Sequence, residues 1–323
     1  MEQTPRQDTL LQVRGLKTWF PIRRGVFART VGHVRAVDGV SFEIARGETV
    51  GLVGESGCGK TTLGRTLAGL EQANAGEVLF DGRDLLQLDP GEMRRLRRRI
   101  QMIFQDPFSS LNPRMSALDI VTEALVEHKL MRGTREQEGA RLMREVGLNV
   151  ESRFRYPHEF SGGQRQRLNI ARALSLNPDF VICDEAVSAL DVSVQAQVVN
   201  LLIDLREKYD LSYLFIAHDL SVVRLISQRV VVMYLGRIVE TGAADEVMDQ
   251  PLHPYTKALV SAIPVPGVDR RKRIILQGET PSPANPPPGC PFHPRCPSVM
   301  PICRREWPGT RHADGRRVNC HLY

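Results

Sequence analysis

Residues 54–61 have the composition and spacing of a loop that binds phosphate groups. The stretch reads GESGCGKT and fits the pattern G-x-x-x-x-G-K-[ST]. Its glycines let backbone N–H groups turn towards an anion, Lys60 would reach the β- and γ-phosphates, and the Thr61 hydroxyl would bind Mg²⁺. The residues expected to contact the nucleotide here are Gly54, Glu55, Ser56, Gly57, Cys58, Gly59, Lys60, Thr61 and Thr62. The alternative is a glycine-rich turn with a surface lysine, so the flanking sequence has to decide.

The flanks of this loop are those of a strand and a helix. Residues 49–53 form a short apolar run, as expected of a buried strand. Leu63, Leu67 and Leu70 follow at helical spacing. A strand, a glycine-rich loop and a helix N-terminus in this order predict a nucleoside triphosphate site, since the helix start adds its partial positive charge.

Two acidic residues follow a second buried run. Residues 180–183 are apolar without alternation, which is typical of a central parallel strand, and Asp184 and Glu185 come directly after them. We predict that Asp184 binds Mg²⁺ and that Glu185 polarises the attacking water. A solvated acidic turn is the alternative.

A second anion site is predicted at Ser161, Gly162, Gly163 and Gln164, where a serine at an N-cap position precedes two glycines and a helical pattern. The chain has only one lysine-bearing loop of this kind. The simplest arrangement is a head-to-tail dimer in which one subunit's loop and the other's serine–glycine turn enclose each nucleotide.

Three further residues stand at predicted strand ends. Gln105 and His218 each follow an apolar run and could reach a γ-phosphate or its water. Phe20, near the end of the first strand pattern, could stack on a purine base or belong to the core.

The order of the patterns predicts an α/β body. Residues 9–50 alternate apolar and polar positions, which predicts an antiparallel β-layer with turns at residues 31–33 and 45–47. Residues 114–177 are mostly helical in pattern and suggest an inserted α-helical lobe. From Pro264 onward proline becomes frequent, and regular structure is expected to give way to a small loop-rich C-terminal module.

Composition narrows the class of protein. The 323 residues are 42% hydrophobic and 25% charged, and the net charge of +6 is modest for this length. No apolar run is long enough to span a membrane, and residues 1–8 lack a signal-peptide core, so we expect a cytoplasmic protein. The densest basic run, residues 94–99, has no interleaved aromatics, and we expect no nucleic-acid partner.

Four of the six cysteines gather near the C-terminus, with the spacing C-x5-C-x6-C-x16-C. In a cytoplasmic protein such a cluster indicates metal or redox chemistry before disulfides. The spacing matches neither the common structural zinc pattern nor the common ferredoxin runs. Zinc, an iron–sulfur cluster and free or paired thiols therefore remain open on spacing alone. The residues are Cys290, Cys296, Cys303 and Cys320.

Taken together, these motifs resemble the ATPase subunits of ABC transporters, over roughly residues 10–260. The resemblance implies a P-loop ABC ATPase fold with catalytic Glu185, His218 and Gln105, and with Mg²⁺ held by Thr61, Gln105 and Asp184. It places Phe20 as the aromatic that stacks on adenine, with Trp19 a weaker candidate. It also implies a segment that communicates across the ATPase dimer: Ser188, Ala189, Leu190 and Asp191. Ala186 departs from the family, which usually has proline after the catalytic glutamate.

Further short motifs resemble the dipeptide/oligopeptide importer subfamily, and its second ATPase subunit most. They lie at residues 104–107, 111–113, 156–158, 253–256 and 285–290. This resemblance implies an ABC ATPase domain over residues 1–265, with a helical subdomain at about 106–177, and a C-terminal module over 266–323. It also implies a [4Fe–4S] cluster on the four C-terminal cysteines, with zinc less favoured.

The resemblance implies a set of partners and a place in the cell. ATP and Mg²⁺ would be bound at the cytoplasmic face of the inner membrane. The partners would be a homologous ATPase, two membrane permeases and, indirectly, an extracytoplasmic solute-binding protein. Nickel or glutathione could replace peptide as the solute. The alternatives from other classes are a soluble ABC-type ATPase of DNA repair or translation and a metal-sensing regulatory ATPase.

Overall fold

The computed structural model describes residues 8–25, 27–263 and 274–323. The chain divides into two compact units, each built from segments that are distant in sequence. The first unit comprises Met1–Ile44, Thr49–Gln87 and Ala217–Tyr323, and the second comprises Ala45–Glu48 and Leu88–Ile216. The predicted boundary between residues 265 and 266 falls outside the described residues, and the predicted domain limits stay a prediction.

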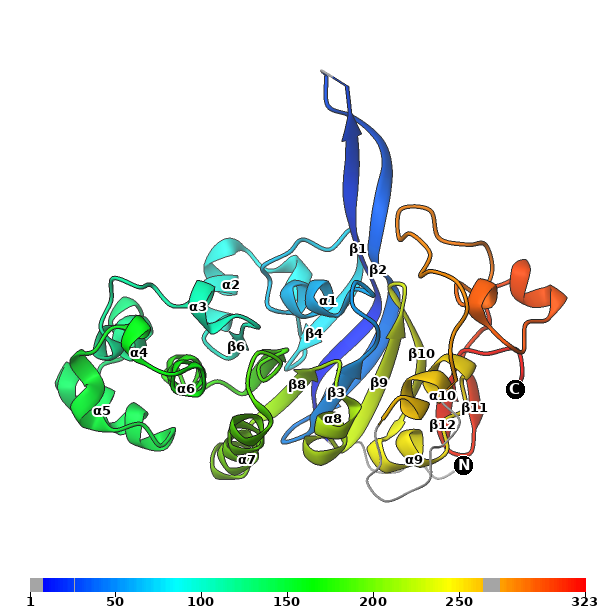
Figure 1. Ribbon diagram of the computed structural model, residues 1–323. Helices are drawn as coiled ribbons and strands as arrows, with labels where there is room; N and C mark the ends of the chain where they lie inside the picture. The colour runs from blue at the N-terminus through cyan, green and yellow to red at the C-terminus, as the bar shows by residue number, and fades with distance from the viewer. Residues whose placement is uncertain (1–7, 26, 264–273) are drawn as a thin grey trace. The chain divides into compact units, whose positions relative to one another are not determined.

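The first unit is rich in strands (Figure 1). Its strands are β1 (Thr9–Arg24), β2 (Arg29–Ala45), β3 (Thr49–Val53), β4 (Ala75–Phe80), β5 (Arg83–Asp84), β9 (Arg229–Tyr234), β10 (Arg237–Ala243), β11 (Arg311–Ala313) and β12 (Arg316–Val318). Its helices are α1 (Lys60–Leu67), α8 (Leu220–Ile226), α9 (Ala244–Asp249) and α10 (Pro254–Ser261), with 3₁₀ turns η1 (Leu85–Gln87), η4 (His293–Arg295) and η5 (Pro301–Arg304).

The β-layer of this unit has the strand order β2-β1-β4-β5, and β1 and β2 run side by side as two long strands (Figure 1). β1 pairs antiparallel with β4, and β4 with β5, so β1 and β2 lie in an antiparallel layer as predicted, which β4 and β5 extend beyond residues 9–50. The predicted turn at residues 31–33 is wrong, because these residues lie inside β2. Gly32 has an extended backbone there and not the positive φ of a glycine in a turn.

The second sheet region of the first unit has the order β11-β12-β10-β9-β3. β3 pairs in parallel with β9, with Val50 opposite Arg229, and all five residues of β3 are buried. β10 pairs antiparallel with both β9 and β12. The predicted loop-rich C-terminal module therefore does contain short strands, and Val318 of β12 lies opposite Glu240 of β10. Leu252, Val318 and Cys320 form a small apolar cluster at this edge.

The second unit combines three parallel strands with a group of helices. Its elements are α2 (Pro90–Leu96), β6 (Ile100–Ile103), α3 (Pro107–Ser110), α4 (Ala117–Glu127), α5 (Arg135–Glu145), η2 (Val150–Phe154), η3 (Pro157–Glu159), α6 (Gly162–Leu174), β7 (Phe180–Asp184), α7 (Val192–Tyr209) and β8 (Ser212–Ile216). The strand order is β8-β7-β6, and both pairings are parallel. α4, α5 and α6 contact one another, in agreement with the helical lobe expected from the sequence.

Local sequence explains where these helices begin. Ser116, Thr134 and Ser161 are the N-caps of α4, α5 and α6, and each forms a capping box with the residue three positions later. Each box satisfies backbone N–H groups that the first helical turn leaves without partners. Serine and threonine at these positions therefore set the starting points of the three helices.

Candidate functional site

The phosphate-binding loop connects β3 to α1 in a conformation that requires glycine. Gly54 and Gly59 have φ values of 157° and 105°. A Cβ on Gly59 would lie 2.0 Å from the carbonyl oxygen of Ala36, and one on Gly54 would lie 2.2 Å from that of Met233. The loop is thus packed against β2 and β9 so closely that side chains are excluded at both positions. Gly59 is the N-cap of α1 and brings no side chain to it, so an anion can approach the first N–H groups of the helix.

Lys60 is buried within this loop and braces it. Its Nζ donates hydrogen bonds to the carbonyl oxygens of Gly54 at 2.8 Å and of Glu55 at 3.0 Å. Lys60 is only 4% exposed, so its charge is held at the helix start rather than free in solvent. The alternative of a glycine-rich turn with a surface lysine is therefore excluded.

The other predicted residues of the first unit differ in exposure. Thr61 and Thr62 are half-buried in the first turn of α1, and His218 is exposed just before α8. Phe20 is 37% exposed on β1. Trp19, its neighbour, is instead engaged by Arg35, whose guanidinium lies 5.0 Å from the indole centroid. Of the two aromatic side chains, Phe20 is the one that presents its ring to solvent, as base stacking requires.

In the second unit, the ends of two parallel strands bring Gln105 and Glu185 together. β6 and β7 are in register, with Ile103 opposite Cys183, so both residues follow the last strand pair by two positions. The Gln105 Nε2 atom donates a hydrogen bond to Oε2 of Glu185 at 2.8 Å. Asp184, the last residue of β7, is only 2% exposed.

The backbone of Glu185 is in an unusual conformation. Its φ is +47°, in the left-handed region that side chains larger than those of glycine, asparagine and aspartate rarely adopt. Its N–H donates to the carbonyl oxygen of Ile216 at 2.9 Å, and its own carbonyl accepts from the Ser188 hydroxyl at 2.9 Å. Contacts on both sides therefore hold a strained residue in place, which is common where a side chain must be aimed at a reaction.

The predicted serine–glycine turn stands at the start of α6. The Gln164 N–H donates to Oγ of Ser161 at 3.3 Å, while the Ser161 N–H donates to Oε1 of Gln164 at 3.0 Å. Ser161 and Gln164 are exposed, and Gly162 and Gly163 are half-buried. A Cβ on Gly163 would lie 2.4 Å from Cγ1 of Val194, so α7 leaves room only for glycine there.

The predicted dimer-communication segment lies next to this turn. A Cβ on Gly162 would lie 3.6 Å from Cδ2 of Leu190. Asp191 caps α7 by accepting the N–H of Val194 at 3.0 Å, and this hydrogen bond lowers the pKa of its carboxyl. The structure therefore brings residues 161–164 and 188–191 together within the second unit.

The C-terminal thiols share one neighbourhood but form no closed metal site. Cys290, Cys296, Cys303 and Cys320 are all free. The Cys290 N–H donates to the carbonyl oxygen of Cys303 at 2.9 Å, and burial, together with the three other thiols, raises the pKa of Cys290 to about 11. Across residues 8–25, 27–263 and 274–323, however, no group of three or more His, Cys, Asp or Glu side chains is arranged to hold a metal ion. The thiols are donors of the type that a metal cluster requires, but their arrangement is not that of a metal site.

The two remaining cysteines are packing residues. Cys58 in the loop is 3% exposed, and Cys183 in β7 is fully buried. Desolvation raises the pKa of both thiols, and in Cys58 the Lys60 charge opposes that shift. Neither side chain is poised as a reactive thiolate.

Two family models match the chain. One described as "ABC transporter" matches residues 37–188, and one described as "Oligopeptide/dipeptide transporter, C-terminal region" matches residues 239–303. The oligopeptide transport ATP-binding protein AppF of Bacillus subtilis is 54% identical over 98% of this chain and 98% of its own length. The chain belongs to the ATP-binding subunits of ABC transporters, in the oligopeptide/dipeptide group.

Other relatives agree with this assignment. The dipeptide transport ATP-binding protein DppF of Escherichia coli is 50% identical over 99% of this chain and 96% of its own length. Among solved structures, the dimeric ATP-binding cassette MJ0796, in a post-hydrolysis state bound to ADP and Pi, matches with a TM-score of 0.64 and 26% identity. That match covers 72% of this chain and 98% of the other. The fold predicted from the sequence, a P-loop ABC ATPase with a β-layer and a helical subdomain, is confirmed.

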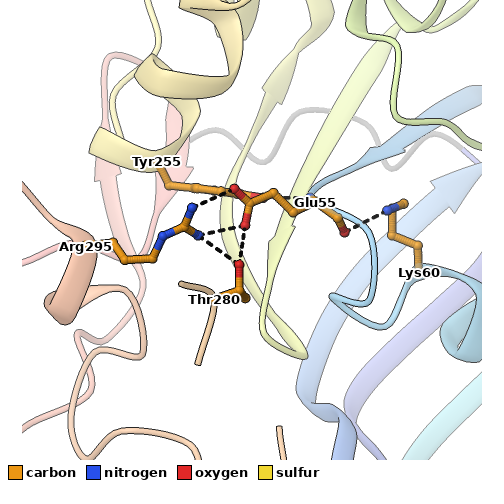
Figure 2. Close-up of polar contacts among 5 residues, drawn as sticks. All are labelled: Glu55, Lys60, Tyr255, Thr280 and Arg295. Atoms are coloured by element: carbon orange, nitrogen blue, oxygen red, sulfur yellow. Dashed lines mark hydrogen bonds and ion pairs between the residues drawn. The ribbon is translucent and has the colours of Figure 1, made fainter. Parts of the chain in front are cut away.

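This ABC ATPase subunit also contains residues that sequence reasoning missed. Tyr255, Thr280 and Arg295 all contact Glu55 in the phosphate-binding loop (Figure 2). All three lie within the range of the C-terminal family model. Residue 255 belonged to one of the motifs that resembled the importer subfamily, but no local pattern linked it to the loop.

Among the described residues, no helix is long and apolar enough to cross a membrane.

Proposed function

We propose that this ATPase subunit energises the import of di- or oligopeptides. The AppF and DppF relatives, named as oligopeptide and dipeptide transport proteins, align along nearly the whole chain and support this substrate class. The matched C-terminal region is of the same type. Solute contacts would lie in other subunits, so nickel or glutathione systems are outcomes that a substrate test must distinguish.

The chemistry of hydrolysis would be carried by the predicted residues. Lys60 and the backbone of residues 54–59 would bind the phosphates, and Thr61, Gln105 and Asp184 would hold Mg²⁺. Their hydroxyl, amide and carboxylate oxygens are the donors that this ion prefers, and it would neutralise charge on the β- and γ-phosphates. Glu185 would accept a proton from the attacking water, and His218 would contact the γ-phosphate. The observation that carries this assignment is the Gln105–Glu185 hydrogen bond of 2.8 Å at the ends of β6 and β7.

The site would be completed by a second ATPase. Residues 161–164 form a helix start suited to an anion, and we infer that they contact the nucleotide held by the partner's loop. Residues 188–191, adjacent to that turn, would then communicate conformational changes between the two ATPase subunits. A homologous ATPase, two membrane permeases and an extracytoplasmic solute-binding protein would be the partners, and the assembly would act at the cytoplasmic face of the membrane.

Purification of the tagged full chain from its own cells in mild detergent tests this proposal. We expect co-purification of a second ATPase and two permeases, and ATP hydrolysis that rises when a binding protein loaded with peptide is added. Stimulation by nickel or glutathione and not by peptide would reassign the solute. Recovery of nucleic acid or ribosomes in place of permeases would favour a soluble ABC-type ATPase.

A [4Fe–4S] cluster on the four C-terminal cysteines is a separate proposal. It is supported by the chemical type of the four donors and by the contact between Cys290 and Cys303, whose carbonyl accepts the Cys290 N–H at 2.9 Å. Iron content and visible absorbance of anaerobically purified protein test it. Protein with neither iron nor zinc would contradict both metal assignments.

A further inference from the structure

The phosphate-binding loop carries an acidic residue where its ligand is a polyanion. Glu55 is the second residue of the loop and lies between Gly54, whose carbonyl binds Lys60, and the exposed Ser56. An uncompensated carboxylate at this place would repel phosphate groups, and the repulsion is strongest where the site is shielded from water. The chain must therefore either neutralise Glu55 or accept weaker nucleotide binding.

A guanidinium from the C-terminal module neutralises it. Nη1 of Arg295 donates to Oε2 of Glu55 at 2.7 Å, and Nη2 donates to Oε1 at 3.0 Å (Figure 2). The Thr280 hydroxyl donates to the same Oε2 at 3.1 Å. This two-pronged geometry is the strongest that arginine and a carboxylate form.

The ion pair is shielded from solvent, which strengthens it. The Arg295 side chain is 8% exposed and that of Glu55 is 27% exposed. An arginine side chain keeps its proton in proteins, so the guanidinium is charged at any physiological pH. Shielded, bidentate pairs of this kind differ from surface ion pairs, which contribute little.

The backbone of Glu55 links this ion pair to the residue that would bind phosphate. Its N–H donates to the Tyr255 hydroxyl at 2.7 Å, and its carbonyl oxygen accepts from Nζ of Lys60 at 3.0 Å (Figure 2). Glu55 is therefore held by four partners: two on its side chain, one on its N–H and one on its carbonyl oxygen. Displacing the Glu55 side chain would displace a carbonyl that positions Lys60.

An aromatic cluster holds the partners of Glu55 in place. The Tyr255 ring meets Tyr234 edge-on with centroids 4.7 Å apart, and Phe292 packs against Tyr255 at 5.5 Å. Phe292 and Tyr255 are both fully buried. Since Phe292 directly precedes η4, which ends at Arg295, the cluster fixes the segment that carries the guanidinium.

We propose that Arg295 is a positioning residue for nucleotide binding, which neutralises Glu55 and holds the phosphate-binding loop in its binding conformation from the C-terminal module. This rests on the proposed function, because it assumes that residues 54–61 bind the ATP that is hydrolysed. It gives the C-terminal module a direct role in ATP affinity, whatever its thiols bind.

The alternative is that Arg295 only docks the C-terminal module. The two roles predict different results when both charges are removed. If Arg295 only docks the module, removing Glu55 as well cannot restore nucleotide binding. If Arg295 neutralises and positions Glu55, replacing Glu55 with an uncharged isostere removes the repulsion and restores most of the affinity.

The experiment uses the full chain assembled with its partner subunits and compares Arg295→Met, Glu55→Gln, the double variant and Arg295→Lys. Arg304→Met, at an exposed arginine of η5 in the same module, is the matched control. Mg-ATP affinity is measured directly, and KM and kcat are measured separately. For Arg295→Met we expect KM and Kd to rise about tenfold with kcat changed by less than about threefold, since ground-state binding is lost. The double variant should return to within about threefold of wild type.

The proposal would be overturned if Arg295→Met bound Mg-ATP as tightly as the control Arg304→Met. It would also be overturned if the double variant bound Mg-ATP as weakly as Arg295→Met alone. If Arg295→Met does not fold, Arg295→Lys decides, because lysine keeps the charge and loses the fork. Arg295→Lys should weaken Mg-ATP binding about threefold, and adding Glu55→Gln should restore the affinity. If Arg295→Lys bound Mg-ATP as tightly as Arg304→Met, the proposal would be overturned. Wild-type protein that binds Mg-ATP but is not stimulated by peptide would contradict the proposed transport function and leave the affinity comparison valid.

Discussion

Gln105 and Glu185 are hydrogen-bonded at 2.8 Å although 80 residues separate them in the chain. The contact follows from register, because β6 and β7 are parallel neighbours with Ile103 opposite Cys183. Side chains that follow parallel strands at the same distance meet at the carboxyl edge of the sheet, where open α/β folds bind their ligands. The backbone of Glu185, at φ +47°, is held there against its ordinary preference.

Glu185→Gln tests whether this carboxylate is the base of ATP hydrolysis. Glutamine keeps the size of the side chain and its bond to Gln105 after an amide rotation, but it cannot accept a proton. We expect Mg-ATP binding to stay within about threefold of wild type, while hydrolysis in the assembled complex falls at least about a hundredfold. Glu151→Gln, at an exposed position of the same unit, is the control. Turnover near the wild-type rate would exclude Glu185 as the base.

Gln105→Ala tests whether the amide positions Glu185. Gln105 is exposed, so its truncation should change the free energy of unfolding by no more than about 0.5 kcal/mol. Loss of this hydrogen bond removes a contact that orients the Glu185 carboxylate, and kcat should fall about tenfold or more. Gln101→Ala on β6, whose side chain donates to the Arg97 carbonyl, is the comparison. If the two variants hydrolyse ATP equally well, Gln105 has no positioning role.

Sequence patterns correctly predicted the strands and the loop that carry several of the candidate site residues, because these elements depend on local sequence order. The buried runs of β3 and β7 and the glycine-rich loop were predicted correctly, because continuous apolar strands and a G-x-x-x-x-G-K-T stretch leave few alternatives. Gly32 misled the prediction of a turn, since a glycine in extended backbone looks the same in sequence as one in a turn. β11 and β12 were missed because they are short and polar and are stabilised by pairing with β10.

The contact of Arg295 with Glu55 could not be predicted at all. The two residues lie 240 positions apart, and no repeating pattern or turn signal connects them. A lone arginine in a proline-rich segment has many possible partners, and only tertiary structure selects one. The four C-terminal cysteines lie close together in the sequence, which predicted a possible metal site. Whether their sulfur atoms are arranged to hold a metal depends on the loops between them, and sequence spacing does not determine that arrangement.

Substitutions at Ser161 separate its role as a helix cap from its proposed contact with the partner's nucleotide. Ser161→Ala removes the capping hydrogen bond to Gln164 and should cost about 1 kcal/mol of stability. Ser161→Asp preserves a capping oxygen but adds a negative charge where a phosphate is expected. We predict near wild-type thermal stability for Ser161→Asp, with ATP hydrolysis reduced at least about tenfold by charge repulsion.

Thr134→Asp provides the control for Ser161→Asp, since Thr134 caps α5 through the same kind of box and is exposed. It should keep both stability and hydrolysis. Thermal melting and ATPase rates of the assembled complex are the measurements. A Ser161→Asp variant with full activity would remove residues 161–164 from the nucleotide site.

His253 should make the protein less stable in acid. It is 1% exposed, and its Nδ1 accepts the N–H of Tyr255 at 3.0 Å as the cap of α10. Desolvation, with a smaller contribution from Lys257, lowers the pKa of His253 from 6.5 to about 3. Because the folded pKa lies below the unfolded one, the unfolded chain binds more protons between these values. Stability should therefore fall as pH drops from about 6.5 towards 3, by up to about 1.4 kcal/mol per pH unit from this group.

His253→Asn isolates this effect, because asparagine can still cap α10 but does not titrate. The variant loses the packing of the imidazole against Phe292, at 5.5 Å between centroids, so it should be less stable by a constant amount at all pH values. Its denaturant midpoint should nevertheless fall less steeply than that of wild type between pH 6 and pH 4. Parallel midpoint curves would mean that His253 becomes protonated inside the folded protein, and that solvent reaches the interior beside Tyr255 and the phosphate-binding loop.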